Sequence, residues 1–402
     1  MYRVFRAVLI GIAGMSVFCT LSAQDISPWT SFTVDGKTVQ FHGFFSEGFA
    51  YTNDNNYLTM DTSNGSFFSE GALNASSQIT DKFRVGAQVY VRDIGHFGQW
   101  SPELDWAYGD YKFASWFGVR AGKVKTTFGL YNDSQDMEFL QTWALLPQSI
   151  YAVDQRSSYI AHTGADLYGS VSPKKLGTFS YVAWAGKNPS DLNGGYAYAL
   201  STIGVDYTTY GGRSDGADLR WATPLSGLTV GASYMARDVV GNGTWDIYGP
   251  PSPVHEESKK EYLQQFYGQY VRGNFHADYE YRRYFRGIMV DSSMPVSDDD
   301  RAWYASGAYR VSKRLELGSY YSHFVDVRPY TGLAPTDPGS YVHDKVVTAR
   351  IDITSHMYLK VEGHFMSGYA EYALVRGFYG PQNPDGFSPT TNMLALRTGW
   401  NF

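Results

Sequence analysis

The clearest pattern in the sequence is an alternation of apolar and polar residues over short runs. In the run FRVGAQVYVR, residues 83–92, the odd-numbered positions are apolar and the even-numbered positions are Arg, Gly, Gln, Tyr and Arg. The runs 275–282 and 357–365 alternate in the same way. Because successive side chains of a strand point to opposite faces of a sheet, each run predicts a strand with one apolar and one polar face.

Patterns of this kind recur along most of the chain and predict sixteen strands. The run 198–210 also alternates, but we assign it to a long fourth loop. A seventeenth strand would place the two chain ends on opposite sides of a closed sheet, whereas an even number keeps them together. The predicted strands are 39–51, 64–78, 82–94, 103–112, 116–128, 159–172, 178–187, 216–223, 228–240, 259–271, 275–287, 299–311, 314–326, 341–353, 357–370 and 390–402.

The apolar faces of these strands meet either a dry core, as in a soluble sandwich, or lipid, as in a membrane barrel. Three features favour the barrel: aromatic residues at strand ends, an alternation of short and long connections, and a last strand that runs to the final residue. That strand places Leu394, Leu396, Thr398, Trp400 and Phe402 on one face. We therefore predict an all-β fold, a transmembrane antiparallel β-barrel of about 16 strands around an aqueous channel.

The N-terminus predicts an exported protein. Arg3 and Arg6 precede a short apolar run, 7–18, and small residues follow it, which is typical of a secretory signal peptide cleaved after residue 23. Cys19, the only cysteine, lies in that segment, so a disulfide scaffold is excluded. The chain is accordingly divided into a signal peptide, a periplasmic lead-in and an outer-membrane barrel, at residues 1–23, 24–38 and 39–402.

Composition and charge exclude two further classes of protein. The chain has 33 basic and 39 acidic residues, a net charge of −6, and lacks the basic stripe of a nucleic-acid-binding protein. A hydrophobic content of 43% is too high for a disordered chain.

Several runs resemble the Gram-negative outer-membrane porins, most strongly over residues 40 to 175 and at the C-terminus. The runs that carry the resemblance are FHGFFSEGF (41–49), NNYL (55–58), ELDWAYGDY (103–111), RAGKVK (120–125), FGLYN (128–132) and the C-terminal strand. The resemblance implies a sixteen-stranded homotrimer whose third loop folds into the lumen. It also implies that Trp400 and Phe402 belong to a C-terminal signal read by the barrel-insertion machinery.

On this resemblance, the connection 132–158 would narrow the channel. Its run 136–146 is predicted to form a short helix. It would present three acidic residues, Asp133, Asp136 and Glu138, and would be held to the wall by three hydrophobic residues, Phe139, Trp143 and Leu146.

The polar faces of the strands carry arginines that are predicted to line the lumen opposite these acids. They are Arg84, Arg92, Arg220, Arg282, Arg310, Arg350 and Arg397. Acids facing a basic row would create a transverse field at the narrowest point, where charge and diameter sort solutes. In the alternative interpretation, these arginines only pair with acids of the wall. The candidate partners are Asp105, Asp166, Glu280, Glu316 and Asp352.

No catalytic, metal or cofactor site is predicted. Ser322 and His323 are adjacent on a strand and so face opposite sides, and the chain has no Gly-x-Ser-x-Gly motif. Asp298, Asp299 and Asp300 lie in a predicted outer loop, where such a run is more often solvated than metal-binding.

The predicted function is a non-enzymatic porin for passive diffusion of small hydrophilic solutes. Expected partners are outer-membrane lipid, lipopolysaccharide, the barrel-insertion machinery and further copies of the chain, with no nucleic acid. The alternatives are a channel selective for organic anions or phosphate, an outer-membrane hydrolase, and a structural or adhesive barrel without an open pore.

Overall fold

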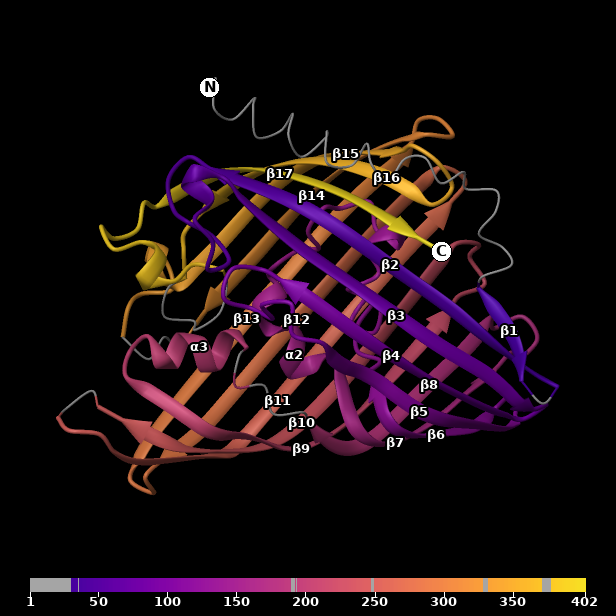
Figure 1. Ribbon diagram of the computed structural model, residues 1–402, viewed down its shortest axis with the longest axis horizontal. Coiled ribbons are helices and arrows are strands. Elements are labelled where there is room, and N and C mark those ends of the chain that lie inside the picture. Colours follow the sequence, from indigo (N-terminus) through magenta and orange to yellow (C-terminus); the bar gives the residue numbers. More distant parts are fainter. Residues whose placement is uncertain are drawn as a thin grey trace.

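The computed structural model describes residues 30–34, 36–188, 192, 194–246, 249–327, 332–370 and 377–402, so the predicted signal peptide lies outside the described residues. Sixteen strands, β2 to β17, form a closed antiparallel barrel in which each strand pairs with its neighbours in sequence (Figure 1). The barrel closes where β17 pairs with β2, from Met393–Thr52 to Asn401–Phe44. The fold prediction is confirmed.

The barrel strands match the predicted ones in number and order. Their bounds are β2 Lys37–Thr52, β3 Ser66–Thr80, β4 Phe83–Asp93, β5 Glu103–Ala114, β6 Phe117–Lys125, β7 Ala161–Val171, β8 Thr178–Asn188, β9 Val205–Ala222, β10 Leu228–Trp245, β11 Ser252–Arg272, β12 Phe275–Val290, β13 Met294–Arg310, β14 Leu315–Asp326, β15 Tyr341–Asp352, β16 Met357–Ser367 and β17 Thr390–Asn401.

A short extra strand, β1 (Ser31–Val34), forms a hairpin with the start of β2. Gly36, in the turn, has φ +73°, a conformation that glycine adopts without strain. β1 pairs with residues 37–40 of β2, next to the stretch that β17 covers. Part of the predicted lead-in therefore belongs to the sheet.

The alternation seen in the sequence corresponds to the two faces of the wall. Outward-facing Leu73, Phe266 and Phe365 are each more than half exposed. Inward-facing Gln88 and Glu280 have no exposed surface. The polar faces line the interior and the apolar faces form the outer surface, as predicted.

The two ends of the barrel differ in their connections. We call the end with the tight connections the turn end; these are residues 81–82, 115–116, 172–177, 223–227, 273–274, 311–314 and 353–356. We call the other the loop end; its connections are residues 53–65, 94–102, 126–160, 189–204, 246–251, 291–293, 327–340 and 368–389.

The strands β9 to β13 extend further toward the loop end than predicted. β9 begins at Val205 rather than at 216, so it includes residues 205–210 of the run 198–210. The helix α3 (Gly195–Ser201) includes residues 198–201, and a turn, 202–204, joins the two. These extended hairpins project beyond the other strands in Figure 1. The connections 246–251 and 291–293 are consequently short, although long ones were expected at this end.

The helical elements are brief and lie in the connections. Besides α3, they are η2 (Thr62–Asn64), η3 (Glu138–Leu140), η4 (Val153–Gln155), α2 (Arg156–Tyr159), η5 (Pro338–Ser340) and η7 (Gly380–Gln382). Across the described part of the chain, no helix has the length and apolar character needed to cross a bilayer.

Candidate functional site

The connection between β6 and β7, residues 126–160, lies inside the barrel, and we call it the inner segment. Its Ser157 accepts a 2.8 Å hydrogen bond from Arg92 of β4, and its Ile150 carbonyl accepts one of 2.6 Å from Arg282 of β12. Because β4 and β12 are eight strands apart in a ring of sixteen, they face each other across the lumen. The inner segment therefore spans the interior from wall to wall.

The predicted helix over 136–146 is wrong: only Glu138–Leu140 is helical, as a single 3-10 turn. The wall takes the backbone groups that a helix would use. The amides of Ala144 and Leu145 each donate a 3.0 Å hydrogen bond to the Glu362 carboxylate of β16. The Gln141 carbonyl accepts a hydrogen bond from Arg350 of β15. With these partners, residues 141–146 follow the wall through a series of bends and do not form a helix.

Asp136 belongs to a compact cluster of two acids and two bases. Lys125 Nζ and Arg156 Nη2 lie 2.7 and 3.0 Å from the Asp136 carboxylate, and the same two cations contact Asp105 at 3.4 and 2.8 Å. The Arg156 guanidinium also stacks on the Tyr90 ring, 3.8 Å from its centroid. All five side chains are buried. The charges of the four ionic groups cancel, and they fix the start of the inner segment to β4, β5 and β6.

Glu138 makes a second set of ion pairs, with β16 and β17. Its carboxylate lies 3.1 Å from Lys360 Nζ and 2.9 Å from Arg397 Nη1. Lys360 has no exposed surface and also donates to the Trp143 carbonyl at 2.7 Å. Arg397 pairs in addition with Glu70 of β3. Glu138 and Arg397, which were predicted to lie on opposite sides of an opening, are thus in direct contact.

Burial changes the titration of two acids in the inner segment. Removal of its carboxylate from water raises the pKa of Glu138 to about 7, although the nearby Lys360 opposes this rise. Burial also raises the pKa of Asp133, whose carboxylate accepts a long, 3.5 Å hydrogen bond from Thr127. Glu138 is therefore partly protonated near neutral pH.

On the opposite wall, two acids of β12 hold the inner segment: Asp278 accepts a 2.6 Å hydrogen bond from Tyr131, and Glu280 makes several. The Glu280 carboxylate accepts hydrogen bonds from the Tyr151 hydroxyl at 2.7 Å and from the Leu130 amide at 3.1 Å, both in the inner segment. The hydroxyl of Tyr304, on β13, donates to it at 2.8 Å. Glu280 is fully buried, and its bonds with the segment replace the water it loses.

The predicted lumen arginines all occupy inward-facing positions, but most of them bind the inner segment. Arg92, Arg220, Arg282, Arg350 and Arg397 each donate to a backbone carbonyl within residues 129–153. Arg310 instead pairs with Glu316 and Asp352, and Arg84 donates to Ser76. Wall pairing, the alternative interpretation, describes Arg310 and part of the contacts of Arg350 and Arg397, which also pair with Asp352 and Glu70. Arg84 does not contact the segment, and the remaining five arginines tie it to the wall.

Two of the three predicted hydrophobic anchors are fully packed. Trp143 and Leu146 join a buried cluster with Tyr320 and Phe324 of β14, and the Trp143 ring meets the Tyr320 ring edge-on with centroids 5.0 Å apart. Phe139 is only partly buried, with its ring 6.0 Å from that of Phe44. Trp143 and Leu146 therefore anchor the segment, while Phe139 faces open space.

The loop end of the lumen is filled by a second apolar cluster. It joins the connections that follow β2, β4, β6, β8 and β16, and its central rings are those of Phe97 and Tyr379, with centroids 6.2 Å apart. Other members are Tyr57, Leu58, Met60, Ile94, Leu145, Ala199 and Phe378. We call this the loop-end cluster. It packs above the inner segment, with Leu145 as the shared residue.

Some functional residues lay outside the predicted set. Lys360 and Glu362 alternate with apolar neighbours in β16, so their inward position was readable from the sequence. Arg156 was not predicted, because it lies in the irregular part of the inner segment and no pattern marks it.

Ser322 is buried and faces inward while His323 faces outward, as the alternation predicted. The described residues contain no His, Cys, Asp and Glu group arranged to hold a metal ion.

No protein-family model and no curated protein matches the sequence. The fold, in contrast, matches solved outer-membrane proteins along most of the chain. A trimer form of OmpT, an outer membrane protein of Vibrio cholerae, is 12% identical with a TM-score of 0.52, covering 91% of this chain and 99% of that one.

Two channels give similar values. The outer membrane channel DcaP of Acinetobacter baumannii is 10% identical with a TM-score of 0.55, covering 93% of this chain and 100% of its own. An anion-selective porin from Comamonas acidovorans is 10% identical with a TM-score of 0.56, covering 91% and 100%. This chain therefore shares the barrel fold of outer-membrane porins and channels.

Proposed function

We propose that the protein is an outer-membrane porin that lets small hydrophilic solutes diffuse passively through a narrow, water-containing lumen, without catalysis. The observation that carries the proposal is the inner segment, which crosses a polar-lined sixteen-stranded barrel and is tied to opposite walls by Arg92 and Arg282. A segment held so firmly by buried charges is suited to fix the size of a constriction.

The outer surface supports a membrane location. Exposed Phe and Leu side chains cover the outward positions of the strands, which is the face that lipid would contact. Trp400 and Phe402 lie at the turn end with ring centroids 5.0 Å apart, and Phe402 exchanges backbone hydrogen bonds with Gly43. We propose that these two aromatic residues belong to the insertion signal and that the turn end faces the periplasm.

We also propose that copies of the chain associate through the wall formed by β17, β2, β3 and β4. Glu47 faces outward there, between Phe45 and Phe49, and accepts a 2.6 Å hydrogen bond from Ser69. An acidic side chain in this position is unfavourable against lipid, so a protein surface is the better neighbour. The trimer form among the similar structures agrees with a trimer.

Native gel migration of E47K tests this association. The added lysine should split the oligomer into monomers, because it cannot accept the hydrogen bond from Ser69 and would bury a longer, unpaired cation in the contact. The same charge placed on the far wall, in A305K, serves as the matched control, since Ala305 also faces outward but lies on β13. Dissociation of both variants alike would contradict the proposed interface.

Liposome swelling tests the function itself. Vesicles containing the purified, folded protein should swell in small sugars at a rate that falls with solute size. Swelling no faster than that of empty vesicles would contradict the porin proposal, provided that the protein remains folded on a gel run without heating.

A further inference from the structure

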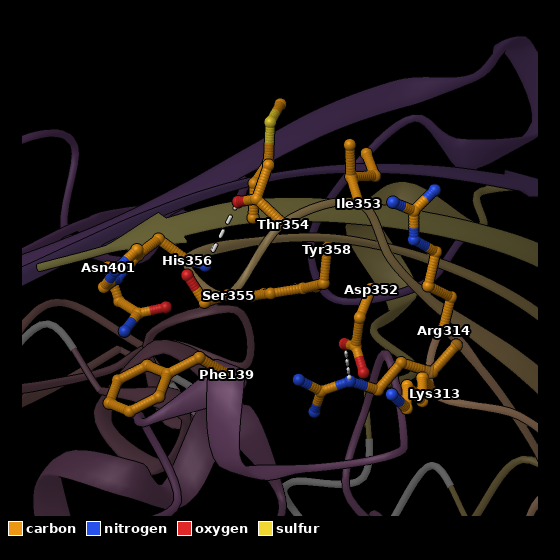
Figure 2. A pocket seen from close by; sticks show the side chains of 12 residues that line it. Phe139, Lys313, Arg314, Asp352, Ile353, Thr354, Ser355, His356, Tyr358 and Asn401 are labelled. Atoms are coloured by element: carbon orange, nitrogen blue, oxygen red, sulfur yellow. Dashed lines mark hydrogen bonds and ion pairs between the residues drawn. The ribbon is translucent and has the colours of Figure 1, made fainter. Parts of the chain in front are cut away.

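A polar cavity lies at the turn end of the lumen, beneath the turn that joins β15 to β16. Its volume is about 420 Å³, within the range of small-molecule sites. Figure 2 shows its lining, with the turn Ile353–His356 on one side and Phe139 of the inner segment on the other. The cavity is thus next to the constriction but is built mostly from the wall.

Positive charge predominates in the lining. Lys313 and Arg314, from the turn between β13 and β14, line the cavity together with Arg350. Arg350 is paired with Asp352, whose carboxylate accepts a 2.8 Å hydrogen bond from it. Among the described residues, the side chains of Lys313 and Arg314 have neither an ion pair nor a hydrogen bond. Two cations therefore remain available to an anion.

A buried polar atom in the lining also lacks a partner. His356 Nδ1 has no hydrogen-bond partner among the described residues, although its backbone amide donates to Thr354 at 3.1 Å. Buried polar atoms without partners are uncommon and costly, so a ligand or water that bonded this atom would be favoured. Figure 2 places His356 beside Asn401 at one side of the cavity.

The cavity has an apolar side as well. Phe139 is partly buried, and its ring lies at the edge of the cavity in Figure 2. An inorganic anion would use only the cations, whereas a carboxylate with an apolar body would use both parts of the lining.

We propose that this cavity is a binding site for small organic carboxylates, a step that rests on the proposed porin function. The carboxylate is held by Lys313 and Arg314, and the apolar body packs against Phe139. A site at the periplasmic side of the constriction raises the local concentration of such anions where they leave the channel.

Two independent measurements test the site. One is the block of channel current by benzoate, and the other is the binding of benzoate to the protein in detergent solution. In the wild-type protein, benzoate should block chloride current in a saturable way. The variant K313Q/R314Q should raise the half-blocking concentration by about fivefold, since two partly solvated charge contacts are lost. Calorimetry of the detergent-solubilised protein should give the same change in affinity without requiring any conductance.

The matched control is K174Q/K175Q, which removes two adjacent lysines from another turn-end connection, outside the cavity. Its half-blocking concentration should equal that of the wild type. The proposed site would be contradicted if benzoate blocked the wild type and K313Q/R314Q at the same concentration. It would also be contradicted if inorganic phosphate or benzyl alcohol blocked the wild type as strongly as benzoate does. Benzoate binding by calorimetry with no chloride current would instead contradict the porin function alone.

Discussion

The two ends of the lumen differ in what fills them. At the loop end, five connections meet in an apolar cluster around Phe97 and Tyr379, both at most 4% exposed. At the turn end, tight turns surround a polar cavity of about 420 Å³ with unpaired cations. The inner segment separates the two regions. The comparison shows apolar packing at one end and a polar, mainly basic lining at the other, so on the proposed porin function we expect packing to limit access from the loop end and charge to act at the turn end.

The largest predicted effect comes from loosening the loop-end cluster. In F97A/Y379A, each truncation removes a buried ring and should lower the free energy of unfolding by about 3–5 kcal/mol. The connections should then separate more often, and solute entry in liposome swelling should increase.

The outward-facing F266A removes an aromatic ring of similar size from the outer surface, where it is 55% exposed. Its swelling rate should equal that of the wild type. Unchanged swelling in F97A/Y379A would mean that the loop-end cluster does not restrict access.

The next largest effect is expected from removing the buried cation at the inner segment. K360M removes one of the two cations that pair with Glu138, with only Arg397 remaining, and should destabilise the barrel by about 3 kcal/mol. The measurement is the temperature at which the folded band disappears on a gel. The exposed Lys345, on β15, gives the control K345M, which should lie within about 0.5 kcal/mol of the wild type.

A smaller effect is expected from crowding Trp143. Gly318 of β14 makes room for this ring, since a Cβ atom there would lie 2.8 Å from it. G318V should displace Trp143 at a cost of about 1–3 kcal/mol and shift tryptophan fluorescence to longer wavelength. Gly307, on β13, has no atom within 4 Å of an added Cβ, so G307V should leave the fluorescence unchanged.

The smallest predicted effect, counted per pH unit, is a pH dependence due to Glu138. Since its pKa is raised from 4.5 to about 7, the folded protein keeps a proton that the unfolded chain releases. This contribution to stability is present below pH 4.5 and is lost as the pH rises to about 7, with a slope of at most about 1.4 kcal/mol per pH unit.

The charged groups facing Glu138 are Lys360, Arg350, Arg397 and Glu362. For the wild type, the urea concentration at the midpoint of unfolding should fall as the pH rises from 4.5 to 8. The same midpoint should change less in E138Q. Equal slopes for the two proteins would assign the pH dependence to other groups.

The strands could be predicted because their signal is local. The alternation within 83–92 or 357–365 can be recognised from adjacent residues alone. Antiparallel pairing of consecutive strands then gives the barrel. The extension of β9 was missed because the alternating run 198–210 was assigned to a loop to keep the number of strands even, whereas residues 205–210 belong to the strand that was predicted to begin at 216.

The ties of the inner segment could not be predicted, because they depend on barrel closure. Glu138 contacts Lys360, 222 residues further along the chain, and this contact requires β16 to have its place in the barrel wall. The predicted helix failed for the same reason: Glu362 and Arg350 take backbone groups of residues 141–145 that a sequence pattern assigns to the helix itself.

Single-channel current with a thiol reagent tests the central claim, that the inner segment lines the narrowest part of an open channel. Cys19 is the only cysteine of the chain and lies in the predicted signal peptide, so L140C would add a unique thiol at a residue that is 58% exposed inside the barrel. A bulky anionic methanethiosulfonate should reduce the current of L140C in steps and leave the outward-facing control L73C unchanged. Absence of current from folded protein, or equal responses of the two variants, would contradict the account.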